Sequence, residues 1–144
     1  MGVVIRNEEG CLMGAMSKKL LFPLGHLEAE ARVAEEGIAL ARDLGLSEVV
    51  IEGDAKIVMS ALANSDPLHT PSSIQKLMKG AKFKLQAFKS WQTRHVHRSC
   101  NVAAHMLAKH AYNVLDSLIW VEDTPLMISI QICMDVSNLG LSLN

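Results

Sequence analysis

The chain has 144 residues, of which 49% are hydrophobic and 20% are charged, and its formal net charge is −1. This length and composition predict a globular domain with its own core and exclude an intrinsically disordered segment. No apolar run approaches the roughly 20 residues that a bilayer span requires, so we expect no membrane partner. Three cysteines without close spacing (Cys11, Cys100 and Cys133) predict a reducing, intracellular compartment, either nucleus or cytoplasm.

The charges are unevenly distributed along the chain. Residues 1–66 contain eleven acidic and six basic residues, whereas residues 67–115 contain eight basic residues and no acidic one. Such a segment is a candidate surface for a polyanion, and a solvated helix face is an equally weighted alternative. The eight basic residues are Lys76, Lys79, Lys82, Lys84, Lys89, Arg94, Arg98 and Lys109.

The first half of the chain predicts a hairpin, a helix and a strand. Apolar residues on both sides of a polar turn that ends in Gly10 predict the hairpin over residues 3–17. Apolar residues at spacings of three and four predict a helix over residues 27–44, which Gly45 ends. The β-branched run that follows predicts an internal, parallel strand over residues 48–52.

The second half predicts further helices and one strand. Helices are expected over residues 55–64 and, with a weak point at Gly80, over residues 73–85. A strand over residues 91–97 and an alanine-rich helix over residues 101–112 follow. The order β-β-α-β-α-α-β-α predicts an α/β fold, a mixed sheet with helices on both faces. Residues 116–144 form a C-terminal tail with a β-prone run at residues 126–134, whose role the sequence leaves open.

Two acidic residues suggest a site within this fold. Glu30 lies on the flank of the first helix's apolar stripe, and Asp54 follows the strand at residues 48–52. If the helix packs on the strand, the two carboxylates converge, which is costly unless a cation lies between them. The alternatives are an ordinary helix-edge acid for Glu30 and a helix N-cap for Asp54.

Four blocks occur in this order along the chain: GVVIRNEEG, AEARVAEEGIALARDLGL, VVIEGDAKIV and HVHRSCNVAAHMLAKHA. Together they resemble the ribonuclease H (type 1) domain, and most closely its reverse-transcriptase-like branch expanded in plants. The resemblance implies a ribonuclease H-like domain over residues 1–115 that lacks the family's first strand. It also implies hydrolysis of the RNA strand of RNA–DNA hybrids, with two Mg²⁺ or Mn²⁺ ions held by four carboxylates.

The resemblance assigns the site residue by residue. Glu30 corresponds to the acid of the first helix and Asp54 to the acid at the strand end, so both are expected to be catalytic metal ligands. His105 stands at the position of the family's last acid, and the acid of the missing first strand has no counterpart. With two of four carboxylates absent, we expect the hydrolytic activity of this chain to be weak or lost.

The remaining assignments concern nucleic acid. His105 is open to three roles: an ordinary helix histidine, a weak metal ligand or a residual general base. Lys76 and Lys79 are expected to follow a phosphate backbone, and Arg98 and Asn101 to contact phosphate or sugar, with helix capping as the alternative for Asn101. The predicted partner is an RNA–DNA hybrid or RNA. A non-catalytic nucleic-acid-binding module and a gene fragment without function of its own are the alternatives, and protein partners and oligomeric state stay open.

Overall fold

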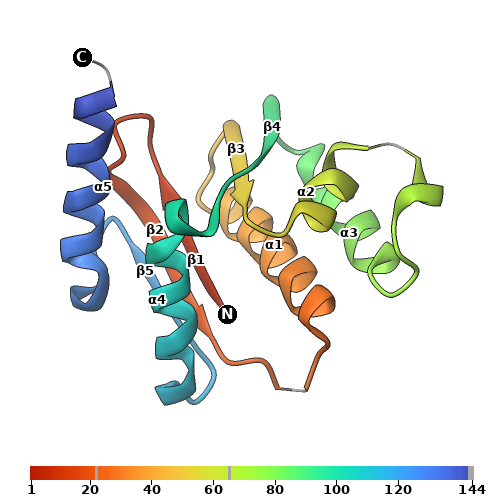
Figure 1. Cartoon of the computed structure of the whole chain (residues 1–144), viewed down its shortest axis with the longest axis horizontal. Helices are drawn as coiled ribbons and strands as arrows, with labels where there is room; N and C mark the ends of the chain where they lie inside the picture. Colours follow the sequence, from red (N-terminus) through yellow and green to blue (C-terminus); the bar gives the residue numbers. More distant parts are fainter. Residues whose placement is uncertain (22, 65, 143–144) are drawn as a thin grey trace. The chain divides into compact units, whose positions relative to one another are not determined.

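The computed structural model in Figure 1 describes residues 1–21, 23–64 and 66–142, with side chains up to residue 135. The described residues form two compact units. Unit 1 combines the described residues of Met1–Leu21 and Val102–Asn144, and unit 2 is formed by those of Phe22–Asn101.

Unit 1 is built on a three-stranded antiparallel sheet with the strand order β1-β2-β5. The strands are β1 (Gly2–Arg6), β2 (Leu12–Lys18) and β5 (Ser117–Val121). Gly10 lies in the β1–β2 turn with a φ of 81°, a left-handed conformation that glycine adopts without steric cost. The predicted hairpin is confirmed, and β5 adds a third strand that the sequence interpretation did not include.

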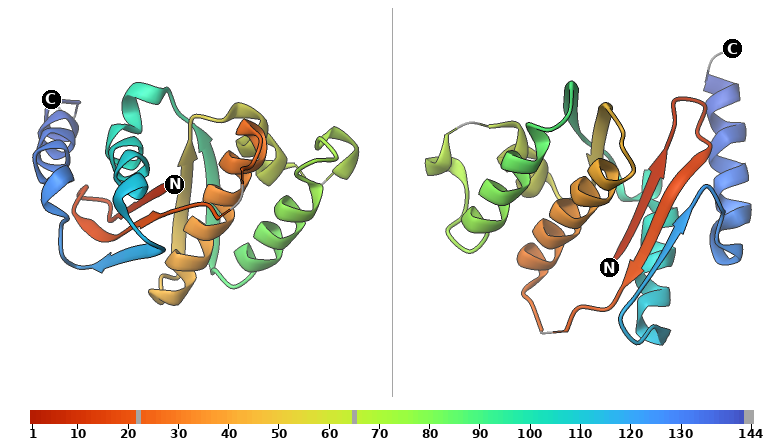
Figure 2. Two further views of the ribbon diagram at one scale, coloured as in Figure 1. Left: turned by 90° about the horizontal axis from the view of Figure 1, so that it is seen from below. Right: turned by 180° about the vertical axis from the view of Figure 1, so that it is seen from behind.

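Helix α4 (Val102–His110) covers one face of this sheet, as Figure 2 shows. Gly2 permits a close approach, because a Cβ atom at this position would lie 2.2 Å from the carbonyl oxygen of Ala104 and 2.5 Å from the backbone nitrogen of Ala108. The buried hydroxyl of Ser17 donates a hydrogen bond of 2.8 Å to the carbonyl of Leu107. The core of unit 1 includes the buried cluster of Leu12, Ala15, Ala103, Leu107, Ile128 and Ile132.

The segment after β5 is helical. A short 3-10 helix, η4 (Leu126–Ile128), leads into α5 (Ser129–Ser142), so the β-prone run at residues 126–134, which the sequence leaves unplaced, is helical. Ile128 and Ile132 recur at a spacing of four and are both buried, and this helical period outweighs the β-propensity of the single residues. Residues 143–144 of the predicted tail lie outside the described residues, and the domain boundary at residue 115 stays a prediction.

Unit 2 contains a parallel strand pair, β3 (Glu48–Gly53) and β4 (Ser90–His95). The predicted parallel pairing is confirmed. The predicted internal position of β3 is wrong, because β3 pairs with β4 alone among the described residues. Every second residue of β3, beginning with Glu48, is exposed, so the apolar run Val49–Ile51 is half buried rather than enclosed on both faces.

Three helices complete unit 2: α1 (His26–Asp43), α2 (Lys56–Ala63) and α3 (Gln75–Leu85). α1 and α2 pack against the strand pair, α3 packs against α1 and α2, and all three lie on the same side of the strands in Figure 2. α3 continues through Gly80 without a break. A Cβ atom at Gly80 would lie 3.2 Å from Glu35 Oε1 of α1, so this glycine lets the two helices pack closely.

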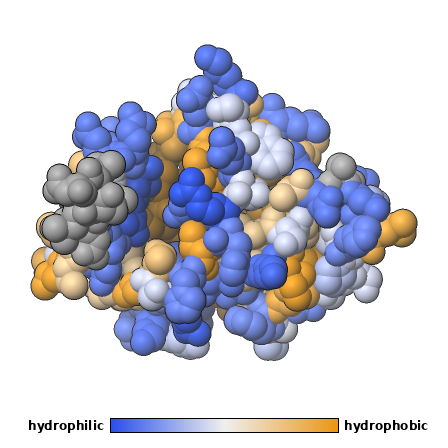
Figure 3. Space-filling view, turned by 45° about the horizontal axis from the view of Figure 1, so that its top comes forward, coloured by the Kyte–Doolittle hydropathy of each residue, from blue (hydrophilic) through white to orange (hydrophobic). Residues whose placement is uncertain are grey.

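None of the described helices is both long enough and apolar enough to cross a membrane. Figure 3 shows one face of the molecule, on which hydrophilic residues predominate and hydrophobic residues form smaller areas between them.

Candidate functional site

Glu30 and Asp54 both belong to unit 2, and both are partly buried. α1 packs against β3 and runs in the opposite direction, because only residues 44–47 connect them and Gly45 turns the chain with a φ of 75°. Along the axis of α1, Glu30 lies about 20 Å before the C-terminal end of the helix. Along the direction of β3, Asp54 lies about 20 Å beyond the first residue of the strand. The two acids therefore stand at the same end of the α1–β3 pair.

The strand ends beside Asp54 are held by hydrogen bonds. The backbone N–H of Val96 donates to the carbonyl of Gly53 at 3.0 Å, and His95 Nε2 lies 3.3 Å from the carbonyl oxygen of Asp54. The N-cap residue of α2 is Ala55. The alternative interpretation of Asp54 as the N-cap residue is therefore wrong.

A protein site for a metal ion groups several His, Cys, Asp or Glu side chains around one point. Within the part of the chain that the structure describes, no group of three or more His, Cys, Asp or Glu residues is placed to hold a metal ion. A site with two ions and four carboxylates does not fit this donor set. Mg²⁺ is commonly bound by one or two carboxylates and several waters, and the binding of an ion by Glu30 and Asp54 stays a prediction.

His105 belongs to α4 of unit 1. It is partly buried, and it lies two residues from both Ala103 and Leu107, which are fully buried. Because a separation of two residues turns about 200° around a helix, His105 faces away from the core of unit 1. Its role in metal binding or catalysis stays a prediction.

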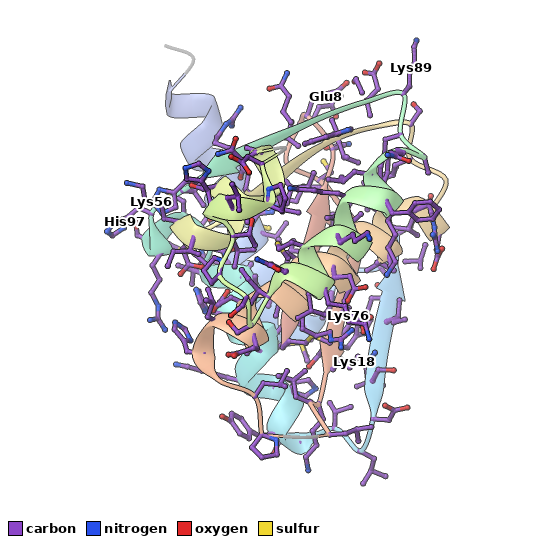
Figure 4. The ribbon with its side chains drawn as sticks, turned by 90° about the vertical axis from the view of Figure 1, so that its right-hand side faces the viewer. Glu8, Lys18, Lys56, Lys76, Lys89 and His97 are labelled. Carbon is purple, nitrogen blue, oxygen red and sulfur yellow. The ribbon has the colours of Figure 1, made fainter. Side chains whose placement is uncertain are left out.

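The four residues predicted to contact nucleic acid lie in two places in unit 2. Lys76 and Lys79 are exposed on α3. Arg98 is exposed in a short 3-10 helix, η2 (Arg98–Cys100), and the N–H of Asn101 donates to the carbonyl of Arg98 at 3.0 Å. Figure 4 labels Lys76 on α3 and His97, the residue before η2, and the two are well separated in that view.

Some of the basic residues are already engaged within the protein. Lys84 Nζ lies 3.1 Å from Glu35 Oε1, Arg94 Nη1 lies 2.8 Å from Glu52 Oε1, and Lys82 donates to the carbonyl of Asn64. Among the described residues of unit 2, the side chains of Lys76, Lys79, Lys89 and Arg98 have no such partner. The sequence count of basic residues therefore overstates the charge that is free to bind a polyanion.

The chain was compared with known families, proteins and structures. The profile of a family described as "Reverse transcriptase-like" matches residues 1–111. The structure is similar to ribonuclease H1 from the halophilic archaeon Halobacterium salinarum, with 24% identity, a TM-score of 0.54, and coverage of 62% of this chain and 67% of that one. It is also similar to the N-terminal ribonuclease H domain of rv2228c from Mycobacterium tuberculosis, solved as a fusion with maltose-binding protein. That comparison gives 20% identity, a TM-score of 0.60, and coverage of 78% of this chain and 93% of that one. The comparison with curated proteins gives no match.

At these identities the two solved structures show the fold alone, and they confirm the predicted ribonuclease H-like α/β fold. Ribonuclease H-like domains bind nucleic acid and generally depend on divalent metal ions. The family match extends over residues 1–111 of a chain of 144 residues. This chain therefore belongs to the reverse transcriptase-like family of ribonuclease H-like domains.

Proposed function

We propose that this domain binds RNA–DNA hybrids and hydrolyses their RNA strand weakly or not at all. The observation that carries the proposal is the position of Glu30 and Asp54 at the same end of the α1–β3 pair, without a third potential ligand grouped with them among the described residues. The acids retain part of a cation site, whereas the donor set is too small for the family's full reaction.

The chemistry explains why two carboxylates give little turnover. Phosphodiester hydrolysis at a two-ion site uses one ion to lower the pKa of the attacking water and the other to neutralise the leaving oxygen. Glu30 and Asp54 supply charge for one Mg²⁺ or Mn²⁺ ion. Without that ion, the two carboxylates repel a phosphate backbone, so a divalent ion favours nucleic-acid binding even where it supports no cleavage.

Arg98 and Asn101 provide polar groups near the same end of unit 2. β3 and β4 are parallel, with Gly53 paired to His95, so the residues that follow each strand emerge at one end of the pair. Figure 4 shows Lys56 and His97, which flank this end in the sequence, at the same edge of the view. We propose that Arg98 and Asn101 contact the backbone of the hybrid at this end of unit 2, and that Lys76 and Lys79 contact a more distant part of the same hybrid.

Two assays on one substrate test the proposal. A hybrid with labelled RNA is incubated with the protein and Mg²⁺ or Mn²⁺, and binding is followed by fluorescence anisotropy at rising salt. We expect salt-dependent binding and no cleavage above the rate in buffer. Cleavage that Asp54→Asn abolishes would show that turnover is retained. No binding at about 50 mM salt would contradict the binding function and favour a fragment without function of its own.

A further inference from the structure

We propose that the outer face of α3 binds single-stranded nucleic acid, with the ring of Phe83 stacked on an unpaired base. This α3 face is defined by Lys76, Lys79 and Phe83 of the helix and by Gln86, its C-cap residue, which continues in a helical conformation. The inference rests on the proposed function only in that both use Lys76 and Lys79 as phosphate contacts. The ligand, an unpaired strand, and the aromatic contact are additional.

Helical geometry places these four side chains together. At about 100° per residue, positions 76, 79, 83 and 86 fall within an arc of about 80° around the helix axis. All four residues are exposed. The opposite side of α3 is buried and consists of Met78, Ala81 and Leu85, which pack against the rest of unit 2. The α3 face is therefore the solvent side of a helix whose other side is fixed.

Phe83 is unusual within this face. Its residue is 74% exposed, whereas Phe88, five positions later, is 7% exposed and belongs to the core. Single exposed hydrophobic residues are common on proteins and do not mark a site by themselves. Phe83 differs because Lys79 and Lys76 precede it by four and seven positions. These spacings place both ammonium groups on the same face of the helix as the ring, one and two turns away.

The charges around the α3 face favour a polyanion. Lys82 and Lys84 flank the face, and both are engaged, Lys82 by the carbonyl of Asn64 and Lys84 by Glu35. Lys76 and Lys79 have no hydrogen bond or ion pair within the described chain. No acidic residue occurs in residues 67–115, so no neighbour along this segment neutralises the two lysines.

The combination of ring and cations favours an unpaired strand over other polyanions. In a duplex or hybrid the faces of the bases are covered by their neighbours, so a ring projecting from a convex helix reaches no base face. In a single strand each base offers a face, and aromatic side chains beside basic ones are the usual means of binding it. An acidic peptide helix would need several apolar anchors. Phe83 is the one highly exposed large hydrophobic residue of α3.

The direct test compares Phe83→Ala with Leu68→Ala. Leu68 is 89% exposed in η1 (Pro67–His69) of the same unit, so both variants remove an exposed hydrophobic side chain and are expected to fold as the parent does. The probe is a fluorescein-labelled oligothymidylate, and a blunt DNA duplex is the paired control. We expect Phe83→Ala to weaken binding of the single strand by about tenfold and to leave binding of the duplex unchanged. Leu68→Ala should change neither.

A second measurement tests the phosphate contacts. In a plot of log affinity for oligothymidylate against log salt concentration, the combined Lys76→Gln and Lys79→Gln variant should reduce the slope by about 1.4, since each contact contributes about 0.7 for single strands. Lys84→Gln should leave the slope unchanged, because Lys84 is paired with Glu35.

Three results would overturn the inference: unchanged single-strand binding in Phe83→Ala, an equal loss for the blunt duplex, or competition by polyglutamate as effective as that by unlabelled oligothymidylate. The last result would indicate an acidic protein partner.

A blunt RNA–DNA hybrid separates this inference from the proposed function. If the hybrid does not bind while the single strand binds through Phe83, the proposed function fails and the inference stands. If the hybrid binds and the Phe83→Ala variant binds the single strand as the parent does, the inference fails and the proposed function stands.

Discussion

At the scale of single residues, glycines decide how closely the elements approach. Gly2 faces backbone atoms of α4. Gly53 faces the end of the Met59 side chain, because a Cβ atom added at Gly53 would lie 2.9 Å from Met59 Cε. Backbone atoms in a packed helix cannot move aside, whereas the end of a methionine side chain adopts another rotamer.

Gly2→Ala should therefore lower the free energy of unfolding by about 1–3 kcal/mol, the usual cost of overpacking. Gly53→Ala is the matched control and should cost less than about 1 kcal/mol, because the side chain it meets is flexible. Urea denaturation followed by circular dichroism measures both. Equal losses in the two variants would show that β1 shifts to accommodate the methyl group.

Asp54 provides a second prediction at this scale. If Asp54 helps to hold a divalent ion, Mn²⁺ should strengthen hybrid binding by the parent protein, and Asp54→Asn should remove most of that effect. Asp43→Asn is the control, because it removes the same charge at the opposite end of α1, where Asp43 contacts Arg42. The measurement is hybrid affinity by anisotropy with and without Mn²⁺, and an equal response of the two variants would argue against an ion at Asp54.

At the scale of elements, the segment from Leu126 onward is part of the fold of unit 1. Ile128 is fully buried in the core of that unit, whereas Ile130, two residues later and therefore on the other side of the helical segment, is 76% exposed. The side chains are the same in size and chemistry and differ in burial alone.

Ile128→Ala should thus lower the free energy of unfolding by about 2–5 kcal/mol. Ile130→Ala should change it by no more than about 0.5 kcal/mol, as expected for an exposed position. Thermal or urea unfolding of the two variants gives the comparison. A small loss in Ile128→Ala would mean that this segment contributes little to the stability of unit 1.

The contact between α1 and α3 includes a second element-scale feature. Glu35, with a side chain 14% exposed, receives Lys84 at 3.1 Å and Arg32 at 2.7 Å. Glu35→Gln removes the negative charge and one of the two acceptor oxygens that Arg32 and Lys84 share, and should cost about 1–2 kcal/mol. A double-mutant cycle with Lys84→Met isolates the pair, and a coupling energy near zero would show that Arg32 alone satisfies Glu35.

At the scale of the whole molecule, the net charge of −1 conceals an uneven distribution. Eight basic residues occur in residues 67–115, and the structure engages three of them: Lys82, Lys84 and Arg94. The other five have no such partner among the described residues: Lys76, Lys79, Lys89 and Arg98 in unit 2, and Lys109 in unit 1.

The slope of log affinity for the hybrid against log salt concentration reports how many basic residues contact phosphates. With about 0.9 per phosphate contact on a duplex, five contacts from this segment contribute about −4.5 to the slope, whereas eight would contribute about −7. We expect a slope shallower than about −5, measured by anisotropy over a series of salt concentrations. A slope near −7 would mean that the engaged residues exchange their partners for phosphates.

The sequence by itself determined the elements and the family. Helical and strand periods depend on residues close together in the chain, so the hairpin, the four helices and the strand pair of the first 112 residues were predicted nearly in place. The four blocks and the assignment of Glu30 and Asp54 also came from the sequence. Whether the two carboxylates share an ion, and whether His105 takes part, stays a prediction.

The tertiary structure decided which charges are free and which side chains are buried. Glu35 and Lys84 are 49 positions apart, and Glu52 and Arg94 are 42 apart, so no local pattern predicts that they pair. The same applies to the burial of Phe88, which lies beyond the end of α3, and to β5, which forms by pairing with the distant strand β2. Ion pairing, and burial outside the periodic elements, depend on contacts between segments far apart in the chain, and local periodicity carries no information about them.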